Sequence, residues 1–314
     1  MCYTTKAVFL ILKTMPWIVL ALIAPACFAI NNFVDRFLVE KKINNAGVLT
    51  IFASALGMVT GVLILVFIGF PILSGSQTVL LLLSGALIGI AVFPYYMAMA
   101  TDDPSRVVPF FQTIPVFVVA GAYIFLREPV ASSQLAGIGA ITLGAFLLSV
   151  KKFNLGLFRL RRSLWLMLLS SLCIAASVVL FRFVVVSQEF WPSLGYNFVG
   201  EGLGGLLLLL FARYRRHSRQ ELKKLSVNLG LIFGANQAIY LAGRSLAYKV
   251  VSLAPAALAS AIGGVQPFYV LALGTALSVW FPFIIKEDIR KSTVALKALA
   301  ICLIFIGVWF VYRQ

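Results

Sequence analysis

Long hydrophobic runs alternate with short polar connections along nearly all of the 314-residue chain. The hydrocarbon core of a bilayer is about 30 Å thick and needs roughly 20 apolar residues of helix per crossing. Each crossing must be helical because backbone groups in lipid have to pair within the segment. The pattern predicts ten transmembrane helices, over residues 16–35, 46–70, 78–100, 105–126, 132–150, 164–186, 193–212, 226–247, 253–281 and 295–312. The ninth is long for one crossing and contains Gly263, Gly264 and Pro267, so we expect it to be kinked or tilted.

The two halves of this pattern resemble each other. Residues 33–37 (FVDRF) near the end of the first helix correspond to residues 179–183 (VLFRF) near the end of the sixth, and Pro115 of the fourth helix corresponds to Pro267 of the ninth. Because five is an odd number, the second copy enters the membrane from the opposite face. We therefore predict an all-α integral membrane protein whose ten transmembrane helices form two inverted five-helix repeats. The predicted units are a first repeat (1–152), a basic connecting loop (153–163) and a second repeat (164–314).

Composition supports the membrane assignment and narrows the partners. The mean hydropathy is +1.02, and 61% of residues are hydrophobic. The net charge of +16 comes mostly from short connections between apolar runs, which is typical of membrane orientation signals rather than of nucleic-acid binding. The basic loops are expected to contact anionic lipid. The sequence has one histidine and no His/Cys cluster, so it predicts neither a metal site nor any other cofactor.

The distribution of basic residues predicts an orientation. Nineteen Lys and Arg residues lie in the odd-numbered connections or at the helix edges that border them, against five in the termini and even-numbered connections. The excess predicts that the odd-numbered connections are cytoplasmic and that both termini are non-cytoplasmic in a multi-pass protein of the cell membrane.

The first half has an alanine-rich end of the third helix (Ala98-Met99-Ala100), a Pro-hydrophobic-Phe segment in the fourth (Pro115-Val116-Phe117), a following Glu128, and Gly137 in the fifth. The corresponding positions of the second half are Ala247, Pro267-Phe268, Glu287 and only Gly307, late in the last helix. With this pattern the chain resembles the drug/metabolite transporter superfamily, and in particular its EamA branch. The second half differs by a longer interval between proline and glutamate. The resemblance implies ten helices in a five-plus-five arrangement, transport of amino acids or related metabolites, export rather than import, and cytoplasmic termini, which is opposite to the orientation that the charges predict.

Ionisable groups inside a membrane are costly and need a reason. Arg182, Glu201 and Arg244 lie within apolar runs and are expected in the same half of the bilayer. They could form a cluster that binds a carboxylate or acts as a gate, with Glu201 as a proton-coupling group. Alternatively, their role is only structural: they form an ion pair, and the arginine side chains extend to the lipid head groups. Asp35 and Arg36 could form a gate at the opposite face or serve as an interfacial anchor.

Neutral polar residues at membrane depth predict a central substrate cavity, although side-chain hydrogen bonds between helices explain each of them as well. The candidates are Asn31, Asn32, Tyr95, Gln112, Asn236, Gln237, Tyr240 and Gln266.

The sequence contains no catalytic motif, so we predict no enzyme and no catalytic residues. The predicted function is secondary transport of a small organic metabolite by alternating access. The alternatives are a polytopic membrane enzyme that acts on a lipid-linked substrate and a receptor or assembly partner that transports nothing. The expected partners are the small-molecule substrate and the lipid bilayer, with a homodimer left open.

Overall fold

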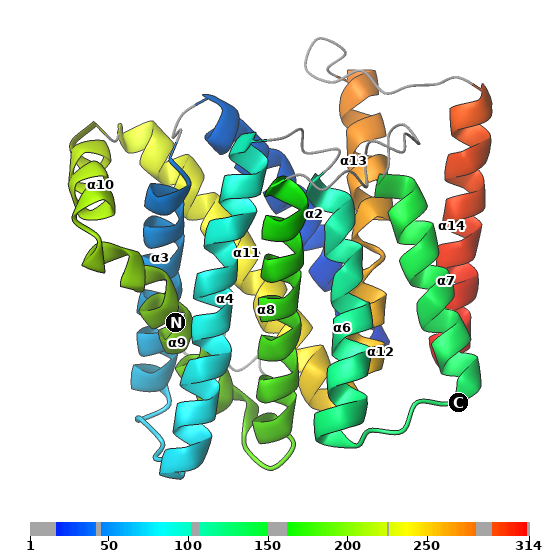
Figure 1. Cartoon of the computed structure of the whole chain (residues 1–314), viewed down its shortest axis with the longest axis horizontal. Helices are drawn as coiled ribbons and strands as arrows, with labels where there is room; N and C mark the ends of the chain where they lie inside the picture. Colours follow the sequence, from blue (N-terminus) through cyan, green and yellow to red (C-terminus); the bar gives the residue numbers. More distant parts are fainter. Residues whose placement is uncertain are drawn as a thin grey trace.

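The computed structural model describes residues 17–41, 45–101, 107–149, 162–224, 226–280 and 291–312, and all statements about structure below refer to them. Helices joined by short turns make up this part of the chain, which contains no strand. Most of the helices run up and down in one bundle (Figure 1).

The first half contains α2 (Trp17–Lys41), α3 (Ala46–Phe67), α4 (Gly75–Thr101), the 3₁₀ helix η1 (Val108–Thr113), α6 (Ile114–Gly121), the π-helical turn η2 (Ala122–Leu126) and α7 (Ser132–Ser149). The second half contains α8 (Arg162–Val185), α9 (Phe190–Leu206), the 3₁₀ helix η4 (Leu207–Leu210), α10 (Ala212–Lys224), α11 (Val227–Leu253), α12 (Ala256–Gly263), α13 (Gln266–Trp280) and α14 (Lys291–Tyr312).

Seven helical segments of the described chain are long and apolar enough to cross a membrane, and an eighth is added if the bent pair α10 and α11 forms one span. Two shorter apolar helices cover Ser132–Leu148 and Lys297–Val311. The chain is therefore an all-helical, multi-pass membrane protein. The arrangement of ten crossings in two inverted repeats stays a prediction, as do the repeat boundaries, and most of the connecting loop 153–163 lies outside the described residues.

The expected break in the ninth apolar run is present. Helix α12 ends at Gly263, and α13 begins at Gln266, one residue before Pro267. Because proline lacks an N–H group, it fits the first turn of a new helix and not the interior of a continuous one.

The basic segment 213–225, expected as a connection, is mostly helical and forms α10. Its sequence lacks Gly and Pro and is rich in Arg, Gln, Glu and Lys, which favour helix. Tyr214 anchors this helix by packing edge-on against Phe93 of α4, with ring centroids 5.7 Å apart. Hydropathy predicts a polar segment between two apolar runs here and does not indicate its conformation.

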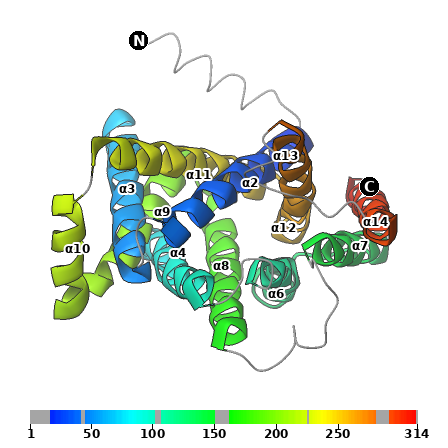
Figure 2. The same cartoon turned by 90° about the horizontal axis from the view of Figure 1, so that it is seen from above.

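Helix α9 lies between α3 and α4 and contacts both extensively (Figure 2). Glycines at the crossings allow the backbones to approach closely, as is common between membrane helices. A methyl group on Gly85 of α4 would lie 2.7 Å from the backbone nitrogen of Glu201, and one on Gly61 of α3 would lie 2.6 Å from that of Val199. These contacts fix the position of α9 and of the polar side chains that it carries.

The remaining helices complete the bundle around this centre. Helix α2 packs against α11, α4 against α8, and α7 against α14. The α7–α14 pair lies at one edge of the bundle in Figure 2, and α10 lies at the opposite edge.

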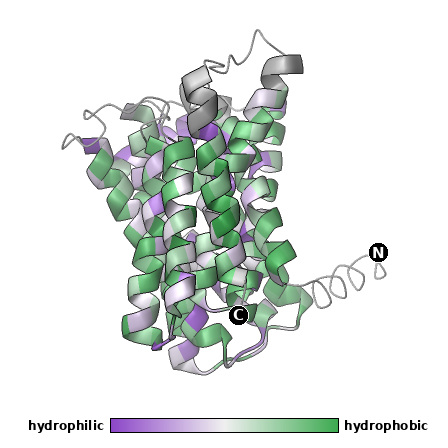
Figure 3. Ribbon diagram, turned by 90° about the vertical axis from the view of Figure 1, so that its right-hand side faces the viewer, coloured by the Kyte–Doolittle hydropathy of each residue, from purple (hydrophilic) through white to green (hydrophobic). Residues whose placement is uncertain are grey.

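Large hydrophobic side chains cover the outside of the bundle, including Phe67, Ile72 and Leu210, which are 85%, 96% and 76% exposed. Figure 3 shows hydrophobic residues along most of the length of the helices and hydrophilic residues mainly near their ends. An apolar surface of this extent is expected to face lipid.

We expect Gly85→Val to destabilise the bundle by at least about 1–3 kcal/mol, because the added methyl groups would separate α4 from α9. Gly234→Val is a matched control, since no atom lies within 4 Å of a methyl group placed on Gly234. Thermal unfolding of the two purified variants in detergent measures the difference. Equal melting temperatures would contradict the close α4–α9 contact.

Candidate functional site

Helix α11 carries a row of polar side chains on one face. Asn236, Tyr240, Arg244 and Tyr248 follow one another at intervals of four residues, a spacing that places them on the same side of a helix. Asn236, Arg244 and Tyr248 are buried. This face contributes to two polar layers with other helices, and a third layer lies at the end of α11.

The middle layer is a buried ion pair between α11 and α9. Arg244 donates from Nη1 to Oε2 of Glu201 and from Nη2 to Oδ1 of Asn197. Glu201 and Asn197 are completely buried, and Arg244 is 3% exposed. The guanidinium also lies over the rings of Phe198 and Tyr248, at 4.9 and 5.1 Å from their centroids. Such packing offsets part of the cost of burying the charge.

Neutral groups extend this layer to two more helices. Asn197 Nδ2 donates to Oγ of Ser84 on α4 over 2.8 Å, and Ser84 Oγ donates to the carbonyl of Ser177 on α8 over 2.8 Å. The Ser177 hydroxyl in turn lies 2.8 Å from the Tyr248 hydroxyl, so the network returns to α11. Four helices are therefore joined through one buried polar network, in which each neutral group has at least one partner.

Two charged atoms of this layer have no hydrogen-bond partner within the described part of the chain. They are Oε1 of Glu201 and Nε of Arg244. An unpaired polar atom in a low-dielectric interior is expensive. Glu201 Oε1 can therefore accept a proton, or a hydrogen bond from water or a ligand, and Arg244 Nε can donate a hydrogen bond to water or a ligand.

A second layer surrounds Asp35 near the end of α2. Asn236 Nδ2 donates to the Asp35 carboxylate over 2.9 Å, and Tyr95 and Tyr96 on α4 lie beside the carboxylate and interact with it. Asp35 is 5% exposed and thus is buried rather than anchored at a membrane surface. Its described partners are neutral. The Asn31 side chain also donates to the backbone carbonyl of Asn236, over 3.4 Å.

A third layer lies where α11 ends and α12 begins. Arg182 of α8 forms an ion pair with Glu128, with 2.7 Å between Nε and Oε1. Arg182 Nη1 also donates to the carbonyls of Val251 and Ser252 in the last turn of α11, and Glu128 Oε2 accepts the N–H of Ala256 at the start of α12. The pair thus satisfies backbone groups that helix ends leave open.

The local backbone aims Glu128 at this junction. The preceding π-helical turn η2 is followed by Arg127, which adopts a left-handed conformation with φ 51° and ψ 31°. The Glu128 N–H then donates to the Ala122 carbonyl over 3.3 Å. A non-glycine residue in this conformation costs about 1–2 kcal/mol, which the contacts of Glu128 offset.

The structure brings together some of the predicted site residues and separates others. Glu201 and Arg244 form a pair, but Arg182 pairs with Glu128 and not with them. Asn31, Tyr95 and Asn236 meet at Asp35, and Gln237 donates to the Ala53 carbonyl over 3.4 Å. The Tyr240 ring packs against Phe28, with centroids 5.9 Å apart.

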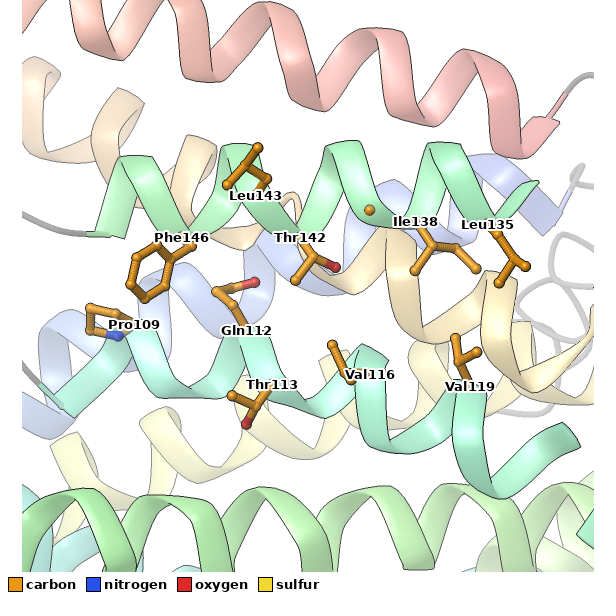
Figure 4. A pocket seen from close by; sticks show the side chains of 11 residues that line it. Pro109, Gln112, Thr113, Val116, Val119, Leu135, Ile138, Thr142, Leu143 and Phe146 are labelled. Atoms are coloured by element: carbon orange, nitrogen blue, oxygen red, sulfur yellow. The ribbon is translucent and has the colours of Figure 1, made fainter. Parts of the chain in front are cut away.

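Four predicted residues lie apart from these layers or outside the described atoms. Gln112 lines a different pocket, between the η1–α6 segment and α7 (Figure 4). Gln266 begins α13, and the Arg36 side chain lies outside the described residues. Asn32 is half-buried on α2. A single cavity shared by all the predicted residues therefore stays a prediction.

Sequence reasoning missed Tyr248, Ser84 and Ser177 as members of the network, and also Glu128 as the partner of Arg182. The four-residue spacing along α11 could have indicated Tyr248, whereas two serines among many carry no such signal. Among the described residues, no group of three or more His, Cys, Asp or Glu side chains could hold a metal ion.

Comparison with known protein families finds a similarity in the first half. Residues 15–150 match the model of the EamA-like transporter family. This part of the chain is similar to that family. The match confirms the resemblance seen in the sequence, and because the family consists of transporters rather than enzymes, it supports a membrane transporter.

A search of solved structures finds a similar fold over the whole chain. One crystal structure covers 94% of this chain and 94% of its own, with a TM-score of 0.65 and 15% sequence identity. At this identity the likeness concerns the fold alone. Comparison with curated proteins finds no match.

We expect Arg244→Met to destabilise the protein by about 3–5 kcal/mol, because it leaves the Glu201 charge buried without a partner. Adding Glu201→Gln should recover much of the lost stability, since the second change removes the isolated charge. Thermal unfolding in detergent compares these variants with Arg215→Met, a change of an exposed arginine on α10. If the single and double variants are equally unstable, the charge pair is not the cause.

Proposed function

We propose that the protein is a secondary transporter that moves a small, amino-acid-like metabolite across the membrane by alternating access, in the direction of export. The observation that supports this most is the buried Glu201–Arg244 pair, which joins α9 to α11 in a chain whose residues 15–150 match the EamA-like transporter family. Charges at membrane depth are commonly functional.

The pairing of helices is compatible with two inverted repeats. In two inverted repeats, each of the first five predicted helices corresponds to one of the last five. Helix α4 then corresponds to α11 and α8 to α2, so the α4–α8 contact should have a counterpart between α11 and α2, and both contacts are extensive. The α3–α9 and α7–α14 contacts each join two corresponding helices. The contact of α4 with α9 has only a weak counterpart between α11 and α3, so the two halves are not equivalent at this point. Substrate sites of such transporters lie near the middle of the membrane between the repeats.

The charges favour a substrate with opposite charges at its two ends. Asn236 contacts the Asp35 layer and Arg244 the Glu201 layer, and these two residues are eight positions, or roughly 12 Å, apart along α11. Tyr240 lies between them in sequence. An ammonium group would be attracted to Asp35, and a carboxylate would compete with Glu201 for Arg244.

Glu201 is the proposed proton-coupling group. A proton on its unpartnered Oε1 would weaken the ion pair and free Arg244 for a substrate carboxylate. Loss of the proton would restore the pair and release the substrate. The Arg182–Glu128 pair is proposed as a gate, because its opening would release the junction of α11 and α12.

Transport into proteoliposomes tests this proposal. With a panel of labelled amino acids and related zwitterions, we expect counterflow of at least one of them. Asp35→Asn should lower this transport at least about tenfold, because the ammonium group loses its countercharge, whereas Glu189→Gln, at an exposed acid before α9, should not. Glu201→Gln should remove the dependence of transport on a pH gradient. Absence of counterflow for every solute would contradict the transporter, and retained pH dependence would contradict the role of Glu201.

We also propose that α10 binds anionic lipid on the cytoplasmic side. Arg213, Arg215, Arg216 and Arg219 are exposed on this helix. An exposed cluster of this kind is attracted to the negatively charged inner leaflet, and each basic residue contributes about 1 kcal/mol to this attraction.

Replacing these four arginines by glutamine should reduce retention of phosphatidylglycerol by the purified protein. Native mass spectrometry with phosphatidylcholine as the comparison lipid measures this change. Equal loss of both lipids would contradict a charge-specific contact, and labelling of α10 from outside intact cells would contradict the predicted orientation.

A further inference from the structure

A separate pocket lies between the η1–α6 segment and α7, away from the three polar layers (Figure 4). Its volume is about 440 Å³, within the range of about 300–1,000 Å³ in which proteins hold small molecules. Helix α7 packs against η1, α12 and α13, and the pocket lies on the side of α7 that faces η1 and α6. The site is thus built from rigid helices and not from loops.

The lining is mostly apolar. Val116 and Val119 of α6 face Leu135, Ile138 and Leu143 of α7 across the pocket. Val116, Leu135 and Leu143 are 54%, 46% and 54% exposed, so the pocket opens on the outer surface of the bundle. In a membrane protein this surface faces lipid, and a ligand would therefore enter from the bilayer.

Two polar side chains belong to this apolar lining. The Thr142 hydroxyl is buried and has no hydrogen-bond partner within the described part of the chain. The Gln112 side chain is 6% exposed. Both side chains project into the space between the facing helices (Figure 4). Polar groups left unpaired at membrane depth are costly, and a ligand group that pairs with them removes this cost.

We propose that this pocket binds a lipid-soluble small molecule with an apolar body and one hydrogen-bonding group, such as a hydroxyl or an amide. The Gln112 amide and the Thr142 hydroxyl bind the polar group, and the apolar body lies along Val116, Val119 and Ile138. The two side chains together can both donate and accept, so the site recognises a neutral group rather than a charge. This proposal does not depend on the proposed transport function.

Gly139 provides a way to fill the pocket without disturbing the fold. It lines the pocket, and a methyl group placed on it has no atom within 4 Å. A leucine at this position would occupy the space intended for the ligand. Gly234 of α11 is equally open but lies elsewhere, so Gly234→Leu is the matched control.

The test is photolabelling of the full-length protein in liposomes with octanol that carries a diazirine on its chain. We expect saturable adducts, mapped by mass spectrometry to residues 109–119 and 135–146. Excess octanol should compete, and octane should compete poorly because it lacks the hydroxyl. Gly139→Leu should reduce the saturable labelling at least about tenfold, and Gly234→Leu should leave it unchanged.

The polar contacts are tested by Gln112→Leu combined with Thr142→Val, which preserves size. The concentration for half-saturation should rise at least about fourfold, because each hydrogen bond contributes roughly a factor of two to ten. Labelling that increases linearly with probe, or that persists in Gly139→Leu, would show ordinary contact with lipid and overturn the site. Equal competition by octane, or no effect of the double variant, would overturn recognition of a polar group.

Discussion

A buried arginine in a lipid environment must be paired, and the pairing of Arg244 determines much of the arrangement of this bundle. Its guanidinium can reach Glu201 and Asn197 only if α11 and α9 lie close together. Helix α9 is itself held between α3 and α4 by glycines that leave no room for a methyl group. Asn197 then binds Ser84, and through it the network reaches α8. Close packing and charge neutralisation therefore require the same geometry, and neither could be changed independently of the other.

The helical elements could be predicted from hydropathy because a membrane imposes a minimum length on each apolar run. The break between α12 and α13 could also be predicted, since Gly263, Gly264 and Pro267 interrupt an overlong run. Helix α10 could not be recognised by the same criterion, because a segment rich in arginine is polar whether it is helical or not. Its conformation depends on helix propensity and on the packing of Tyr214, which hydropathy does not measure.

The residue types in the sequence were sufficient to predict several members of the candidate site, but not which residues they pair with. The cost of burying charge was enough to single out Arg182, Glu201 and Arg244. It could not show that Arg182 binds Glu128, because this contact depends on a π-helical turn and a left-handed Arg127 that redirect the chain. Gln112 illustrates the same limit: its depth along the helix indicated a central cavity, whereas the rotation of the helix directs it to α7. Periodicity predicts the direction in which one side of a helix faces only when several polar residues lie on that side, as on α11.

The three polar layers have different consequences for a moving bundle. The Asp35 layer and the Glu201–Arg244 layer join α11 to α2, α4 and α9 mainly through contacts between side chains, so these contacts can be exchanged for contacts with a ligand. The Arg182–Glu128 layer also holds backbone groups at the junction of α11 and α12, and its loss would leave helix ends unsatisfied. A rearrangement that exposes the middle layer is therefore less costly if α11 and α12 move together as one body. In such a motion the junction of α11 and α12 would rotate against α8 only as far as the Arg182 side chain can keep its contacts with it. The length of that side chain would therefore limit how far the end of α11 can move.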